Sequence, residues 1–233
     1  MAPQGVAIWF ASLPEGMEWH ILCVSAIDRF IQSTADPCLY ILNDGEVIPL
    51  AYVDDILFTG TDEDEVPTTI KQPKERFDTV DVGDARFLLR MAIPRDVHAG
   101  TIRVRQEAYP KAVLDMLGMA DARPAKTPAE PGPTYIEEED TLFPQDTKFF
   151  MSATGSLLYL SRRTRSDITH SVMVLTKSMS KPGPRLMTKL KRVLRYMKGT
   201  VSIGITYRED AEDGDKLTAY VDSDHAGDQD KGY

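Results

Sequence analysis

Two apolar runs separated by a pair of aspartates predict a β-hairpin in the first third of the chain. The first run extends from Val47 to Val53 and the second from Ile56 to Phe58, and Thr59-Gly60 ends the pattern. Short runs rich in β-branched and aromatic residues are typical of buried strands. The sequence therefore predicts strand and hairpin over 38–60, with Asp54 and Asp55 at the tip.

Apolar residues at helical spacing predict an amphipathic helix from about Pro184 to Lys198. Its apolar face would consist of Leu186, Leu190, Val193, Leu194 and Met197. Elsewhere the pattern predicts helices over 20–33, 66–78 and 107–119 and two or three over 148–198, with Ser166 as an N-cap, and short strands within 86–105, 201–207 and 216–222.

The adjacent carboxylates of Asp54 and Asp55 are costly to bury, since each disfavours ionisation of the other. A hard divalent cation would relieve that cost, because Mg²⁺ takes carboxylate and phosphate oxygens and supports two-metal phosphoryl transfer. A polar turn with two solvated aspartates is the alternative, because Asp is favoured in hairpin turns.

The charge of the 233-residue chain is segregated along its length. The net charge is −9, from 27 basic and 36 acidic residues, and acidic runs occur near 62–65, 137–140 and 209–215. Basic residues gather at 162, 163 and 165 and on the outer face of the 184–198 helix: Arg185, Lys189, Lys191, Arg192, Arg195 and Lys198. This face would bind nucleic-acid phosphates in a salt-sensitive way; a solvated helix face is the alternative.

Composition favours an intracellular globular protein with no membrane contact. The hydrophobic content of 42% suffices for a core, and no apolar run reaches the roughly 18 residues of a membrane helix. We see no secretory signal, and Cys23 and Cys38 lack metal-ligand spacing. We expect a cytoplasmic or nuclear location.

Several motifs occur in the order in which they occur in copia-type retrotransposon Pol polyproteins, and the chain resembles their reverse transcriptase from about residue 30 onward. The motifs include Ala-Tyr-Val-Asp-Asp-Ile-Leu-Phe-Thr-Gly at 51–60, Gln-Glu-Ala-Tyr at 106–109, Ala-Lys-Thr-Pro at 125–128, Gly-Ser-Leu-Leu-Tyr-Leu at 155–160, Thr-Arg-Ser-Asp-Ile at 164–168 and Tyr-Val-Asp-Ser-Asp-His-Ala-Gly-Asp at 220–228.

The resemblance implies RNA-directed DNA synthesis with Mg²⁺ or Mn²⁺. It also implies that the cytoplasmic location would be a virus-like particle. The partners would be an RNA template, a DNA primer, deoxynucleoside triphosphates and the rest of the Pol polyprotein. Asp54 would be a metal ligand, Asp55 its paired catalytic residue, and Asp222 the first metal carboxylate of ribonuclease H. Tyr52 would lie at the nucleic acid, and Arg90 replaces the glycine of a Phe-Leu-Gly turn beside the primer, where it would contact phosphate.

The resemblance also implies an incomplete enzyme. The family's upstream palm aspartate has no counterpart in residues 1–29, and most of the ribonuclease H ligands are not encoded. We therefore expect no polymerase activity from the chain alone. The alternative function is that of a non-catalytic transposon remnant with a nucleic-acid-binding or scaffold role.

The expected fold class is α+β, truncated at both ends relative to the family. It would comprise a partial palm of antiparallel sheet with helices (1–105), a thumb helix (106–122), an acidic Pro-rich linker (123–147), a helical connection (148–208) and the first strands of a ribonuclease H-like α/β domain (209–233).

Overall fold

The computed structural model divides the chain into two compact units. The first comprises residues 1–88 and 93–101, and the second comprises 89–92 and 102–233; we call them the sheet unit and the helical unit. The structure describes residues 7–12, 30–42, 47–52, 55–60, 66–69, 71, 80–130, 141–208 and 219. Within these residues the fold mixes helices with antiparallel sheet, as the α+β prediction requires.

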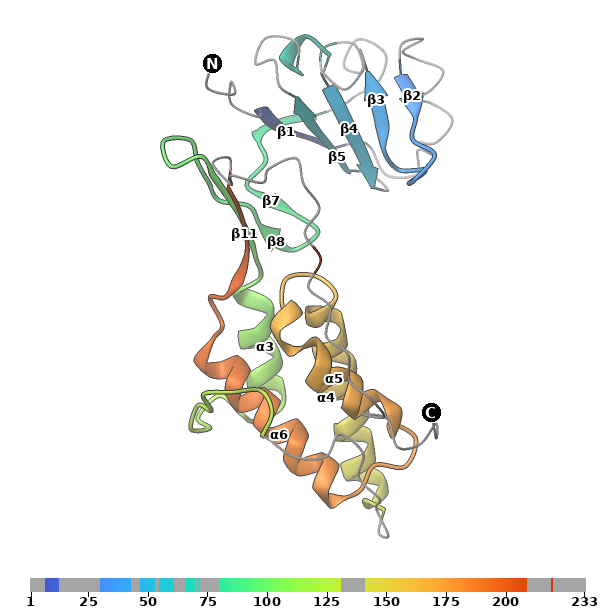
Figure 1. Cartoon of the computed structure of the whole chain (residues 1–233), viewed down its shortest axis with the longest axis vertical. Coiled ribbons are helices and arrows are strands. Elements are labelled where there is room, and N and C mark those ends of the chain that lie inside the picture. Colours follow the sequence, from blue (N-terminus) through green and yellow to red (C-terminus); the bar gives the residue numbers. More distant parts are fainter. Residues whose placement is uncertain are drawn as a thin grey trace. The chain divides into compact units, whose positions relative to one another are not determined.

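A six-stranded antiparallel sheet forms most of the described part of the sheet unit (Figure 1). Its strand order is β2-β3-β4-β5-β1-β6. The strands are β1 (Ala7–Ser12), β2 (Phe30–Gln32), β3 (Tyr40–Leu42), β4 (Val47–Tyr52), β5 (Asp55–Gly60) and β6 (Val80–Asp84). The predicted hairpin is therefore confirmed as β4 and β5.

The register of β4 and β5 separates a buried face from a half-exposed one. Ala51 pairs with Ile56 and Pro49 with Phe58, and all four residues are buried. Because successive side chains of a strand point to opposite faces, the intervening residues share the other face, where Leu50 and Leu57 are only half-buried. The sheet thus has one core face along this hairpin.

One sequence prediction is wrong in the sheet unit. Residues 30–32, the end of the predicted 20–33 helix, form strand β2 and pair with Tyr40–Leu42 of β3. Pairing with a neighbouring strand outweighed the helical pattern, and residues 20–29 lie outside the described part. In the predicted 66–78 helix, residues 66–69 and 71 are helical, and residues 72–78 lie outside the described part of the chain.

Two short strands of the sheet unit, β7 (Phe87–Leu88) and β9 (Arg95–Asp96), lie near the chain's crossing into the helical unit. The helical unit contains strands β8 (Met91–Ala92), β10 (Thr101–Arg105, of which Ile102 onward belongs to this unit) and β11 (Gly204–Arg208), in the order β11-β10-β8. Its helices are α3 (Ala108–Met116), α4 (Pro144–Ser161), the 3-10 turn η2 (Ser166–Ile168), α5 (Thr169–Lys177) and α6 (Pro184–Gly199).

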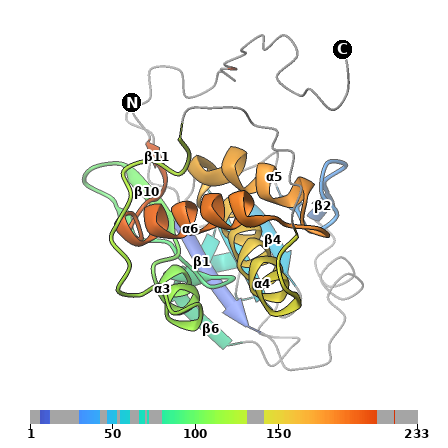
Figure 2. The ribbon, with the colours of Figure 1, turned by 90° about the horizontal axis from the view of Figure 1, so that it is seen from below.

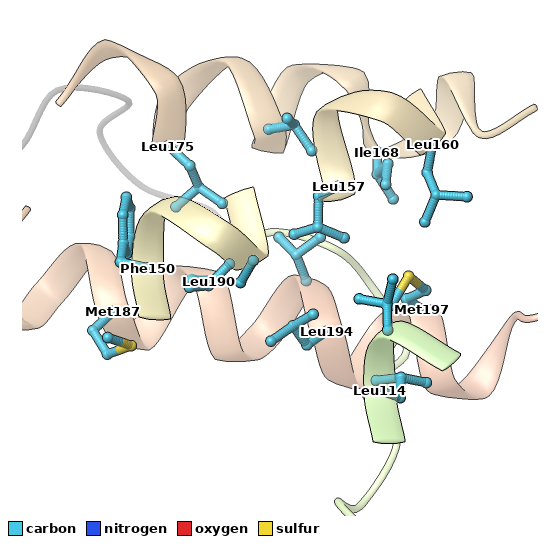
Figure 3. Packing of buried hydrophobic residues seen from close by; sticks show 14 of the residues in the cluster. Leu114, Phe150, Leu157, Leu160, Ile168, Leu175, Met187, Leu190, Leu194 and Met197 are labelled. Atoms are coloured by element: carbon cyan, nitrogen blue, oxygen red, sulfur yellow. The ribbon is translucent and has the colours of Figure 1, made fainter. Parts of the chain in front are cut away.

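The helices enclose one hydrophobic cluster, and α6 contacts α3, α4 and α5 (Figure 2). Figure 3 shows Leu190 and Leu194 of α6 among Phe150 and Leu157 of α4 and Leu175 of α5. These five side chains are essentially inaccessible to solvent. Burying a side chain of this size contributes about 1.5–3 kcal/mol to folding, so this cluster sets the stability of the unit.

The prediction for α6 is confirmed almost to the residue. The helix begins at Pro184, and all five predicted apolar residues, from Leu186 to Met197, are buried. Proline is well tolerated at a first helical position, because its missing amide has no partner there in any helix. Among the described helices, none is long and apolar enough to cross a membrane.

Candidate functional site: an acidic hairpin and a basic helix

The acidic hairpin places Asp55 at the first position of β5, directly opposite Tyr52 at the last position of β4. Asp55 is half-buried, and Tyr52 is 44% exposed. Their pairing puts both on the face opposite buried Ala51 and Ile56. Asp54 and Val53, which join the strands, lie outside the described residues.

Strand β1 lies on the other side of β5, and its register pairs Ser12 with Asp55. Its residues, Ala-Ile-Trp-Phe-Ala-Ser, include no aspartate or glutamate. Within the part of the chain that the structure describes, no three His, Cys, Asp or Glu side chains gather closely enough to hold a metal. Two adjacent carboxylates can serve one hard cation whose other ligands come from substrate phosphates, but they do not supply a two-metal set.

Arg90 lies in a strained two-residue turn between β7 and β8. Leu89 has φ +50° and Arg90 has φ +62°, in the left-handed region that favours glycine. Arg90 is exposed, so its side chain is available to a phosphate. The structure therefore explains why a glycine would suit this position, and it shows backbone strain at the substitution noted in the sequence.

The six cations predicted to line α6 differ in their surroundings. Arg185 and Lys191 are exposed, and Lys189 and Lys198 are half-exposed. Arg192 and Arg195 instead contact residues 123–130, the segment predicted to be the start of a linker. We call residues 123–130 the strap, which is the yellow-green loop beside α6 in Figure 1.

The strap is held by hydrogen bonds to two arginines. The Arg192 guanidinium donates to Thr127 Oγ1 at 2.9 Å and forms an ion pair with Glu130. Arg195 Nε donates to the carbonyl of Arg123 at 2.7 Å, and the amide of Ala125 donates to the carbonyl of Arg195 at 3.2 Å. The start of the predicted linker therefore packs on α6. Its predicted last residues, from Pro144 to residue 147, instead form the first turn of α4.

Arg165, counted with the basic group at 162–165, is buried and only 1% exposed. Its Nε and one terminal nitrogen bind the two carboxylate oxygens of Asp167 at 2.9 Å each. Its terminal nitrogens also donate to the carbonyl and hydroxyl of Thr200, at 3.0 and 2.7 Å. Arg165 therefore joins η2 to the end of α6 and does not belong to a solvent-facing basic surface.

The same network shifts two pKa values. Burial raises the pKa of Asp167, but the hydrogen bond and charge of Arg165, with a 2.9 Å hydrogen bond from Tyr196, outweigh it and bring the pKa below its usual value. Burial and the Asp167 carboxylate raise the pKa of Tyr196. Ser166 is the first residue inside the 3-10 turn η2, whose N-cap is Arg165, so the predicted N-cap role of Ser166 is wrong.

Two tyrosines of the helical unit, Tyr159 and Tyr196, have packing partners. Tyr196 donates to Asp167, and its ring lies 5.7 Å from the Arg165 guanidinium carbon. The Tyr159 ring centroid lies 5.0 Å from that of Tyr109, and its hydroxyl accepts a 3.4 Å hydrogen bond from Gln106. Packing within the helical unit therefore accounts for both side chains.

Sequence reasoning missed the strap and its two cations, Arg123 and Lys126. Its proline content and the acidic run that follows concealed a local signal, which is that residues 123–128 contain two cations and no acid. Asp222, expected to be a metal ligand, lies outside the described residues.

Comparison with known protein families matches residues 14–131 to the family described as reverse transcriptase (RNA-dependent DNA polymerase). The match begins well before residue 30, where the recognised motifs start, so the expectation that residues 1–29 fall outside the resemblance is wrong from residue 14 onward. Strand β1 precedes the match.

Three curated relatives are similar over most of this chain. The retrovirus-related Pol polyprotein from transposon TNT 1-94 of Nicotiana tabacum is 31% identical over 212 residues, covering 86% of this chain and 16% of its own length. The corresponding polyprotein from transposon RE1 of Arabidopsis thaliana is 34% identical over 205 residues, covering 86% and 13%. An uncharacterized mitochondrial protein of the same plant is 33% identical over 178 residues, covering 76% and 71%.

The chain thus spans less than a fifth of the length of the two polyproteins. No solved structure matches it.

Proposed function

The chain belongs to the reverse transcriptase (RNA-dependent DNA polymerase) family, and from this premise we propose that it contributes two parts of a retrotransposon polymerase. These parts are the acidic hairpin of β4 and β5 and a helical unit that holds the template-primer duplex. In this proposal the sheet unit belongs to the palm, α3 to the thumb, α4 to α6 to the connection, and residues 209–233 to the start of ribonuclease H.

The register of the hairpin carries the proposal. Tyr52 and Asp55 face each other at the ends of β4 and β5, on the half-exposed side of the sheet. Polar side chains there are accessible to a substrate, whereas the residues at Ala51 and Ile56 serve the core. Members of this family generally use a divalent metal, and Asp54 and Asp55 are the residues that would hold Mg²⁺ or Mn²⁺.

That ion would stabilise charge on the transferring phosphate. The chain's own contribution is to orient the two carboxylates and to keep the duplex in place, while the primer end and the triphosphate would supply the other oxygen ligands. Asp222 would play the equivalent role in the ribonuclease H part.

We expect no primer extension by the isolated chain, because strand β1 lies beside β5 and offers no carboxylate. Two carboxylates, Asp54 and Asp55, neutralise the charge at the transferring phosphate incompletely. Duplex binding does not require that neutralisation. The helical unit, with cations on the outer face of α6, is therefore expected to bind duplex even when chemistry fails.

The test is primer extension on an RNA template by the purified chain in Mg²⁺ and in Mn²⁺. We expect no product from the wild type alone. We expect product when a polypeptide carrying the upstream palm strand of a related Pol polyprotein is added, and we expect Asp54→Asn to abolish it. Extension by the chain alone that disappears in Asp54→Asn would contradict the proposal of an incomplete site.

Because the sequence of β1 contains no acidic residue, a second function is also favoured, that of a non-catalytic remnant that binds nucleic acid or acts as a scaffold. The two functions differ in the result of adding the upstream palm polypeptide. Asp54-dependent extension supports the polymerase role, and duplex binding without any extension supports the remnant.

A further inference from the structure

The strap lies along the middle of the polar face of α6. Arg192, Arg195 and Gly199 follow the i, i+3, i+7 spacing that places helical residues in one stripe. The residues that α6 buries lie on the opposite side and include Leu186, Leu190, Val193, Leu194 and Met197. The stripe therefore faces away from the hydrophobic cluster and lies on the side of α6 from which a ligand would approach.

Contacts follow this stripe from one end to the other. Glu130 and Thr127 lie at Arg192, and Arg123 and Ala125 lie at Arg195. Pro124 lies at Gly199, where an added Cβ would approach the proline Cβ to 3.1 Å. The strap thus runs antiparallel to the helix, and the seven-residue interval from Arg192 to Gly199 corresponds to about 10 Å.

Arg192 and Arg195 are already engaged with the strap. Arg192 uses its fork on two acceptors, and its charge is paired with Glu130. Arg195 donates its Nε to a backbone carbonyl of the strap. Arg192 would have to release a contact before its fork could bind a phosphate, and both arginines position the strap.

The strap presents two cations of its own, because the Arg123 and Lys126 side chains are exposed. Lys191 and Lys198, seven residues apart, form a neighbouring stripe of α6. Within the described part of the chain, none of these four side chains forms an ion pair with an acid. Among the described acids that flank the strap in sequence, Glu130 is paired with Arg192, and Asp121 precedes the strap.

We propose that the strap is part of the phosphate-binding surface: Arg123 and Lys126 contact the duplex backbone together with Lys191 and Lys198, while Arg192 and Arg195 position them. The inference rests on the proposed function, since it names the residues that hold the duplex. A duplex carries one charge per about 1.7 Å of its axis, so a 10 Å surface faces several phosphates.

The first experiment measures duplex affinity of the whole chain as a function of salt, by fluorescence anisotropy with a labelled RNA–DNA duplex. The slope of log K against log salt is negative, and we expect Arg123→Gln with Lys126→Gln to reduce its magnitude by about 2. Each lost phosphate contact removes about 0.9 from that magnitude. Affinity is then expected to fall about tenfold or more at low salt.

The matched control is Lys148→Gln with Lys181→Gln, which removes the same charge from exposed positions. Lys181 lies three residues before α6, and Leu142, six residues before Lys148, donates to the carbonyl of Pro182. The control positions therefore lie toward the start of α6, about 12 Å along the helix from Arg192, where the strap contacts begin. We expect the control to keep the wild-type slope within about half a unit. A strap variant that keeps the wild-type slope, or a control that loses as much as the strap variant, would overturn the inference.

The second experiment tests the positioning role with Arg192→Lys. Lysine keeps the charge but cannot reproduce the fork on Thr127 and Glu130. We expect faster hydrogen exchange at the Ala125 amide, which is bonded to α6, together with a smaller salt slope. Unchanged exchange contradicts the positioning role, whatever the slope does, because a slope that falls alone would make Arg192 a direct phosphate ligand.

Failure of the inference is distinguishable from failure of the proposed function. A wild-type chain without salt-sensitive duplex binding contradicts both. A wild-type chain that binds, with a slope unchanged in the strap variant, contradicts only the role of Arg123 and Lys126.

Discussion

The acidic hairpin and the basic helix differ in the range of the contacts that determine their charged residues. Asp55 owes its position to pairing with Tyr52 three residues away, and strand alternation gives its face. Arg192 contacts Thr127 and Glu130, which are 65 and 62 residues distant, and Arg165 contacts Thr200 across 35 residues. The local strand pattern therefore fixes the position of Asp55 in the sheet. In the helical unit, contacts between residues distant in sequence decide whether an arginine is engaged within the protein.

The number of cations on α6 overstates the positive charge that is available to a ligand. Six cations of α6 suggest one uniform basic face, yet two of them hold the strap, and Arg165 of a neighbouring basic group is buried. A cation paired within the protein contributes less to a phosphate surface, because its existing contacts must first be lost. Availability, rather than number, is the quantity that links this sequence to nucleic-acid binding.

The largest expected effect tests the two faces of the hairpin. Phe58 is buried and Leu57 is half-buried on the opposite face. We expect Phe58→Ala to destabilise the sheet unit by about 3–5 kcal/mol, since it leaves a cavity in the core. Hydrogen exchange measured in peptides from β3 to β5 would report this change. Leu57→Ala is the matched control, with less than half the effect, and equal effects would refute the assigned faces.

The next effect tests the buried network of the helical unit. Arg165→Ala removes the hydrogen bonds to Thr200 and leaves Asp167 with Tyr196 as its remaining side-chain donor, and we expect a loss of about 3 kcal/mol. Exchange in peptides of α5 and α6 would measure the loss. Arg163→Ala removes an exposed arginine near the Tyr159 ring and should change stability by no more than about 0.5 kcal/mol. A smaller effect for Arg165 than for Arg163 would show that the network is not structural.

A smaller effect concerns the turn at Leu89 and Arg90. Arg90→Gly relieves the positive φ, and we expect a gain of about 1 kcal/mol in the free energy of unfolding. Arg90→Ala keeps the Cβ and should bring no gain, so it separates backbone strain from loss of the arginine side chain. If Arg90 contacts primer phosphate, both variants reduce the magnitude of the salt slope of duplex binding by about 0.9. Equal stabilities of Gly and Ala variants would contradict strain at this turn.

The smallest effect is a pH dependence in the helical unit. Because the folded pKa of Asp167 lies below its ordinary value of 3.8, its ionic contacts stabilise the fold fully above that value and are lost as pH falls through the lowered pKa. Tyr196→Phe removes one hydrogen bond and should raise the pKa of Asp167, at a cost of about 1 kcal/mol in stability. Carboxyl NMR titration would measure the pKa, with exposed Tyr207→Phe as the control. An unchanged pKa would contradict the role of Tyr196.

The sequence predicted best what repeats along one element. The period of apolar residues in α6 follows from local geometry, so its buried face was correctly expected. The two apolar runs likewise predicted the hairpin of β4 and β5, on which Asp55 lies. Residues 30–32 show the limit, since pairing with β3 decides their conformation and no local signal encodes it.

The strap shows the same limit for a binding surface. Its position depends on Arg192 and Arg195 meeting backbone and side-chain acceptors far away in sequence, and a proline-rich segment carries no period that predicts docking. Burial of Arg165 was equally hidden, because an arginine two residues before an aspartate is common on surfaces. Both features arise from packing between elements.

The most direct test of the division between the two regions is duplex binding by two paired variants of the whole chain. Lys191→Glu with Lys198→Glu changes the helical unit, and Asp54→Asn with Asp55→Asn changes the hairpin. We predict that the helix variant loses salt-sensitive binding to an RNA–DNA duplex, while the hairpin variant binds at least as tightly as the wild type. Loss of binding in the hairpin variant, with wild-type affinity in the helix variant, would contradict the account.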